Sequence, residues 1–178
     1  PLLLALACAG SSAASAQLQF QMTPPFPGNI WTNGIEIQDF DGDGNKDVVF
    51  ANGSSYGGTG PNSGSQQQQL FMGNGDDTFT AAHSNLNIPN IDGMMVIAED
   101  FDKDDDLDLF FCVDNSAQPP RLLMNDGNGV FSDETLLRLP PLTSLRSFGL
   151  AAGDVDNDED LDVVILDGGT FGGQQVQH

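Results

Sequence analysis

The sequence reads Asp39-Phe-Asp-Gly-Asp-Gly-Asn-Lys-Asp-Val-Val-Phe50 in one stretch, and the same acidic pattern occurs twice more. The second copy is Asp100-Phe-Asp-Lys-Asp-Asp-Asp-Leu-Asp-Leu-Phe-Phe111, and the third is Asp154-Val-Asp-Asn-Asp-Glu-Asp-Leu-Asp-Val-Val-Ile165. The period is 61 residues from Asp39 to Asp100 and 54 residues from Asp100 to Asp154. Repetition on this scale indicates a protein built from stacked structural units.

Each copy begins with a nine-residue acidic loop, here called the first (residues 39–47), second (100–108) and third (154–162) Asp loop. Side-chain oxygens at positions 1, 3, 5 and 9, with a main-chain carbonyl from position 7, can surround one hard cation at calcium distances. The predicted ligands are Asp39, Asp41, Asp43, Asn45 and Asp47; Asp100, Asp102, Asp104, Asp106 and Asp108; and Asp154, Asp156, Asp158, Asp160 and Asp162. The sequence therefore predicts up to three Ca²⁺ sites.

The alternative is an acidic surface turn that only solvates the fold. Four carboxylates in one turn repel one another, and the loops contain no basic residue except Lys46 and Lys103, so a bound cation is favoured. Magnesium demands octahedral geometry and keeps its waters, while zinc prefers His or Cys ligands, which the loops lack. Gly44 suits a sharp turn at position 6, where Asp105 or Glu159 in a left-handed conformation costs about 1 kcal/mol.

The flanks of the loops exclude an EF-hand, which has the same ligand spacing. An EF-hand needs a bidentate Glu at position 12 and a helix on each side. Position 12 is Phe50, Phe111 or Ile165, and each lies in an apolar run that favours a strand. Dockerin-type modules also continue into a helix, which these runs do not resemble.

Four strands are predicted in each unit. One precedes each Asp loop (residues 34–38, 94–98 and 148–152), and a continuous apolar run follows it (48–50, 109–113 and 163–166), which indicates a strand buried on both faces. The segment Leu70-Phe-Met-Gly-Asn-Gly-Asp-Asp-Thr-Phe79 aligns without a gap on Leu122-Leu-Met-Asn-Asp-Gly-Asn-Gly-Val-Phe131, and both contain the residues of a hairpin turn.

The predicted fold class is therefore all-β, a partial β-propeller of four-stranded blades with the calcium loops between the first and second strands. The blades are expected at about residues 30–83, 93–136 and 147–178, the last one incomplete.

The combined pattern resembles the FG-GAP/VCBS-type repeat. The resemblance rests on Gly34, the first Asp loop with Val48 and Val49, and the turn that ends at Phe79, and it extends over roughly residues 30 to 178. The residues Phe148-Gly149 are similar to the Phe-Gly of the family name, whereas Met95 replaces this glycine in the second unit. The family includes the propeller of integrin α-subunits and many secreted bacterial proteins, so the resemblance implies a propeller with calcium in these loops.

The charge balance limits the possible partners. The chain has 26 Asp plus Glu and 5 Lys plus Arg, a formal net charge of −21, which repels nucleic acid and anionic lipid. No catalytic constellation is evident, because His83 and His178 are isolated and the paired carboxylates fit shared cation ligation better than glycoside hydrolysis. We therefore expect a non-catalytic module that binds an extracellular protein or glycan. The alternative is an accessory or catalytic propeller domain of a larger secreted enzyme that acts on polysaccharide.

The first residues have the features of a secretory leader. Residues 1–16 are apolar and end in small residues, with Ala14 and Ala16 at the −3 and −1 positions of a cleavage site, and no segment is long and apolar enough to span a membrane. We expect a secreted, periplasmic or cell-surface protein with repeats over residues 17–178. Lipidation at Cys8 is the alternative, and Cys112 in its apolar run is expected to be a buried thiol. Residues 18–22 alternate as an edge strand does, and we expect this strand to lack a partner here.

Overall fold

A computed structural model describes residues 4–7, 19–22, 30–54, 64–114, 117–142 and 146–168. The chain forms two compact units, Pro1–Ile30 and Trp31–His178. In the first unit, strand β1 (Leu4–Ala7) pairs antiparallel with strand β2 (Gln19–Met22). The strand predicted at residues 18–22 is therefore present over Gln19–Met22, but the expectation that it lacks a partner is wrong. Its partner strand comes from the predicted leader, which can supply extended backbone as readily as any apolar segment.

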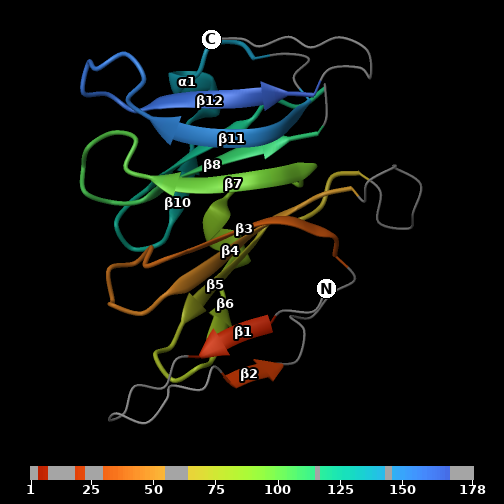
Figure 1. Ribbon diagram of the computed structural model, residues 1–178, viewed down its shortest axis with the longest axis vertical. Helices are drawn as coiled ribbons and strands as arrows, with labels where there is room; N and C mark the ends of the chain where they lie inside the picture. Colours follow the sequence, from red (N-terminus) through yellow and green to blue (C-terminus); the bar gives the residue numbers. More distant parts are fainter. Residues whose placement is uncertain are drawn as a thin grey trace. The chain divides into compact units, whose positions relative to one another are not determined.

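The second unit contains three antiparallel sheets (Figure 1). The first sheet is β3 (Thr32–Gln38), β4 (Asp47–Asn52), β5 (Gln69–Gly73) and β6 (Phe79–Ala81); the second is β7 (Gly93–Glu99), β8 (Asp108–Val113), β9 (Arg121–Asn125) and β10 (Phe131–Asp133); the third is β11 (Ser147–Gly153) and β12 (Asp162–Asp167). A short helical turn follows the fourth strand of each of the two four-stranded sheets: η1 (His83–Leu86) follows β6, and α1 (Thr135–Arg138) follows β10. The prediction of an all-β fold is confirmed.

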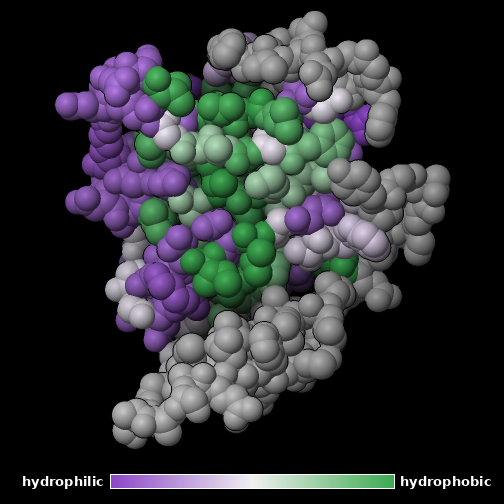
Figure 2. Space-filling model, in the orientation of Figure 1, coloured by the Kyte–Doolittle hydropathy of each residue, from purple (hydrophilic) through white to green (hydrophobic). Residues whose placement is uncertain are grey.

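The first strands of the three sheets lie beside one another, β3 next to β7 and β7 next to β11 (Figure 1). Each four-stranded sheet runs in chain order from this first strand, so the arrangement is that of a partial β-propeller. Each Asp loop joins the first and second strands of its sheet, as predicted, and the three loops project from the same side of the second unit. Hydrophilic residues gather on that side in Figure 2.

The first strand of every sheet has a register shift at the same place in the repeat. The shifts lie between Thr32 and Gly34, between Gly93 and Met95, and between Ser147 and Gly149. A Cβ atom on Gly34 would lie 2.9 Å from the Cα atom of Met95, so a glycine allows β3 to approach β7 closely.

The core lies between adjacent sheets. Thirteen buried residues fill the space between the first two sheets: Phe40, Val49, Ala51, Leu70, Leu86, Ile91, Val96, Ala98, Leu109, Phe111, Val113, Leu123 and Phe131. The rings of Phe40 and Phe131 meet edge to face, with centroids 5.9 Å apart. Phe110, Leu122 and Met124 of the second sheet pack against Leu150, Val163 and Ile165 of the third sheet. Position 2 of the first Asp loop is thus a core residue, which fixes the base of that loop.

Strands β4 and β8 are buried along their whole length, which confirms the prediction from their continuous apolar runs. The same prediction is wrong for β12, where Val164 and Leu166 are about half exposed. Within the described residues a sheet packs against only one face of β12. The side chains of β12 therefore alternate in burial although its sequence resembles that of β4.

Cys112 is buried on β8, as predicted, and burial raises the pKa of its thiol to about 11. A buried thiol with such a pKa is a poor nucleophile at neutral pH. Across the described ranges, no helix is long and apolar enough to cross a membrane.

Candidate metal centre

The three Asp loops share one pattern of main-chain hydrogen bonds. The carboxylate at position 1 accepts the N–H of position 6: Gly44 to Asp39 at 2.9 Å, Asp105 to Asp100 at 3.0 Å, and Glu159 to Asp154 at 3.1 Å. The carboxylate at position 9 accepts the N–H of position 2: Phe40 to Asp47 at 2.8 Å, Phe101 to Asp108 at 3.0 Å, and Val155 to Asp162 at 2.9 Å. The aspartates at positions 1 and 9 therefore shape the loop in addition to any role as ligands.

Positions 4 and 6 of every loop have positive φ. At position 6 the angle is 91° for Gly44, 73° for Asp105 and 71° for Glu159, as the glycine at this position predicted. At position 4 it is 71° for Gly42 and 65° for Lys103 and Asn157. The second left-handed position was not predicted, although Gly42 was a signal for it. Side chains rarely adopt this conformation, so the second and third loops carry strain that the first avoids.

Substitution of Asp105 by glycine is expected to stabilise the protein by about 1 kcal/mol, because glycine adopts the left-handed conformation without a steric penalty. The measurement is urea unfolding in EDTA. Asp105→Ala is the matched control, since it removes the same charge but keeps the Cβ atom. Equal stabilities for the glycine and alanine variants would show that position 6 is not strained.

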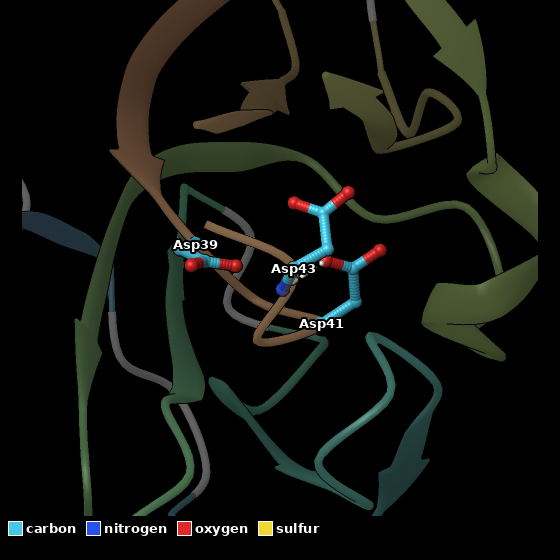
Figure 3. A group of neighbouring side chains, drawn as sticks. All are labelled: Asp39, Asp41 and Asp43. Atoms are coloured by element: carbon cyan, nitrogen blue, oxygen red, sulfur yellow. Dashed lines mark hydrogen bonds between the residues drawn. The ribbon is translucent and has the colours of Figure 1, made fainter. Parts of the chain in front are cut away.

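Each loop brings three carboxylates together. The groups are Asp39, Asp41 and Asp43; Asp100, Asp102 and Asp108; and Asp154, Asp156 and Asp162, and within each group one oxygen per residue lies within 4.8 Å of the others. In Figure 3, Asp39 lies at the end of β3 while Asp41 and Asp43 extend from the loop that follows. The Asp43 N–H donates to Asp41 at 3.2 Å. Oxygen atoms at this spacing can share one hard cation.

The groups differ from the predicted ligand sets at positions 5 and 9. The first group includes position 5 but not Asp47, whereas the second and third include position 9 but neither Asp104 nor Asp158. The carboxylates of Asp104 and Asp158 each accept the N–H of position 7, from Asp106 and Asp160, at 3.0 Å.

The side chains at position 7 are engaged elsewhere in the first and third loops. The Asn45 amide donates to Asp43 at 2.9 Å, and the Asp160 carboxylate pairs with Lys103 at 2.6 Å. The sequence predicts the main-chain carbonyl of position 7 as the ligand, and neither of these side-chain contacts involves that carbonyl.

The aspartate at position 9 also ties its loop to the third strand. Asp108 is fully buried, and its second oxygen accepts the Asn125 N–H at 2.8 Å, as Asp47 accepts the Gly73 N–H at 2.8 Å. Burial raises the pKa of Asp108 to about 6 and shifts the pKa of Asp47 in the same direction. Sequence spacing could not reveal this role, because the partner strand lies beyond a variable loop.

One oxygen of Asp39 is buried and has no hydrogen-bond partner among the described residues. A buried carboxylate oxygen without a donor is strongly disfavoured, and buried charges in proteins are paired or coordinate a metal. Asp39 is the residue at position 1 of the first loop and a member of its group of three neighbouring carboxylates. The first loop therefore has the donor set and the unsatisfied charge that a hard cation would complete.

The second sheet contributes to the first Asp loop. The Asn125 side-chain amide donates to the Phe40 carbonyl at 2.8 Å and to the Leu107 carbonyl at 3.1 Å. A Cβ atom on Gly129, at φ 69°, would lie 3.4 Å from the Cβ atom of Asp41, so the β9–β10 turn packs directly on the loop. The predicted hairpin turn is thus also a contact between sheets.

Two basic side chains contact an Asp loop to which they do not belong. Lys103 extends from the second loop to the third, where its ammonium lies 2.6 Å from both the Glu159 carbonyl and the Asp160 carboxylate. Arg138, on α1, donates to Asp102 at 3.0 Å. Because Arg138 lies far from the second loop in the sequence, no local pattern predicts its contact with Asp102.

His83 has a structural role, as Thr135 does at the aligned position. His83 Nδ1 lies 2.9 Å from the Leu70 carbonyl oxygen and 3.3 Å from the Leu70 nitrogen, and the Leu122 N–H donates to the Thr135 hydroxyl at 3.0 Å. The His83 ring also packs edge to face on Phe71. Each side chain thus supports the first residues of a third strand.

Comparison with known families agrees with this geometry. No curated protein matches the chain. The family described as FG-GAP-like repeat matches residues 39–111 and residues 100–165. Each match begins at an Asp loop and ends in the second strand of the following sheet. Together the matches span well over half of the sequence, and the chain belongs to the FG-GAP-like repeat family.

Proposed function

We propose that the second unit binds calcium in its Asp loops, at up to three sites. The observation that carries the proposal is the buried, unpartnered oxygen of Asp39 beside two further carboxylates. Flexible, all-oxygen donor sets suit calcium better than magnesium, and within the three groups no histidine or cysteine is present for zinc.

In this proposal the ions stiffen one side of a secreted module that binds an extracellular protein or glycan. The apolar leader supports secretion, and the net charge of −21 disfavours nucleic acid as a partner. The aspartates are assigned to ion binding and loop shape, because each is engaged by loop main chain or clustered with other carboxylates. The module is proposed to be non-catalytic.

Calcium titration of the isotope-labelled chain by NMR tests the metal sites one by one. The position-6 amides of Gly44, Asp105 and Glu159 each donate to the first aspartate of their own loop, so each reports one site. We expect all three signals to move with dissociation constants near 10⁻⁴ M, the range of extracellular calcium modules. Magnesium at the same concentrations is the control. Unchanged signals with calcium, or equal responses to both ions, would contradict the proposal.

The same titration should depend on pH at the second loop. In the calcium-free protein the raised pKa of Asp108 means that its protonated form stabilises the fold below about pH 4, a contribution lost as the pH rises through about 6. Calcium favours the ionised form, so protons and calcium compete. Between pH 7 and pH 5 the affinity reported by Asp105 should fall about tenfold. A pH-independent affinity would show that Asp108 is not a ligand.

A further inference from the structure

A positively charged side chain of the protein, Arg138, contacts the second Asp loop. The Arg138 guanidinium donates to Asp102, a member of the second carboxylate group, at 3.0 Å, and to Glu134 at 2.5 Å. The side chains of Asp102 and Arg138 are 24% and 40% exposed, so the pair lies at the solvent-accessible surface. The Arg138 side chain also lines a crevice of about 350 Å³ between the second and third sheets, together with Phe101 and Leu161. Its charge is therefore held close to the second loop.

The first repeat provides an internal comparison. The gap-free alignment of the two hairpins continues to α1 and places Leu86 at the position of Arg138 and Ala82 at the position of Glu134. Leu86 is buried in the core and carries no charge. Among the described residues, ion pairs reach the second and third loops, from Arg138 and Lys103, and none reaches the first. The two loops thus share their main-chain hydrogen bonds, and within the described part of the chain only the second has a cationic side chain of its own helical turn as a partner.

Glu134 determines what happens when Arg138 leaves Asp102. Glu134 lies one helical turn before Arg138 and holds the other side of its guanidinium. If Asp102 turns to a bound ion, the guanidinium keeps Glu134 as a partner and no charge is left unpaired. The exchange is therefore reversible within the folded protein.

We propose that Arg138 competes with calcium for Asp102, which weakens the second site. The inference rests on the calcium binding proposed above. A unit positive charge that shares a carboxylate with a divalent ion should lower the affinity for that ion by about tenfold in a largely aqueous environment. Arg138 is an affinity-determining residue in this scheme and not a ligand.

The test compares two variants of the full chain that remove one positive charge each. Arg138→Gln removes the competitor, and Arg146→Gln is the control. Arg146 is 42% exposed, against 40% for Arg138, and pairs with Asp114 at 2.7 Å, where β8 ends. Calcium titrations are followed by the Asp105 and Gly44 amides. We expect Arg138→Gln to tighten binding at Asp105 about tenfold and to leave Gly44 unchanged, while Arg146→Gln changes neither by more than about twofold.

A second measurement uses the unaltered chain. The Arg138 side-chain N–H signals should move at the same calcium concentration as the Asp105 amide, because the ion displaces the bond to Asp102. If calcium shifts the amides but binding at Asp105 is equal or weaker in Arg138→Gln, the competition proposal is overturned and calcium binding stands. If calcium shifts no amide in any variant, the proposed function and the competition both fall.

Discussion

The midpoint of thermal unfolding should be about 10 °C higher in 1 mM calcium than in EDTA. With a dissociation constant near 10⁻⁴ M, calcium at 1 mM stabilises the folded state by about 1.4 kcal/mol per site, or about 4 kcal/mol for three sites. For a chain of this length, each kcal/mol raises the midpoint by roughly 2–4 °C. The physical cause is the mutual repulsion of the clustered carboxylates, which the ion cancels while it orders the loop.

The unfolding midpoint in magnesium distinguishes binding at specific sites from general charge screening, because the chain has a net charge of −21. Screening would act similarly for both divalent ions, whereas the loops should discriminate between them. Calorimetry or circular dichroism gives the midpoint under each condition. Identical unfolding curves in calcium, magnesium and EDTA would show that the Asp loops are acidic turns that bind no ion.

Asp108→Ala should destabilise the protein by about 3 kcal/mol even in EDTA. The substitution leaves two N–H groups, of Phe101 and Asn125, without their acceptor, and each buried group without a partner costs about 1–3 kcal/mol. Asp108→Asn keeps one acceptor oxygen, so roughly half of the loss is expected. Denaturant unfolding with and without calcium measures both effects.

Asp102→Ala is the matched control, since it removes a carboxylate of the same group without burying an unpaired donor. Its loss in EDTA should be within about 1 kcal/mol, the value of an exposed ion pair, and a further loss of about 1.4 kcal/mol should appear only with calcium. Equal losses for Asp102→Ala and Asp108→Ala in EDTA would show that position 9 has no special structural role.

The strand order and the place of the Asp loops could be predicted from the sequence because both depend on short-range signals. Ligand spacing, turn residues and apolar runs all lie within about ten residues of one another in this chain, and the repeats supply independent copies of each signal. The burial of β4 and β8 followed from the same runs. The exposure of β12 did not, because it depends on which sheets lie beside it.

The details of the candidate site depend on long-range contacts and were not predictable in the same way. Arg138 reaches Asp102, and Asn125 reaches Phe40, across sheets whose relative placement no local pattern contains. The structural role of position 9 is also long-range, because N–H groups of the third strand donate to Asp47 and to Asp108. Gly42 is the opposite case, because a glycine at position 4 is a local signal for the left-handed conformation found there.

The contact of the β9–β10 turn with the first Asp loop affects how the chain folds during its synthesis. Synthesis proceeds from the amino terminus, so the first loop leaves the ribosome long before Asn125 and Gly129, which complete its surroundings. Until then the Phe40 carbonyl lacks its donor, and the Phe40 ring lacks the Phe131 ring that covers it. The first Asp loop is therefore complete only after the second repeat has been made and folded against it.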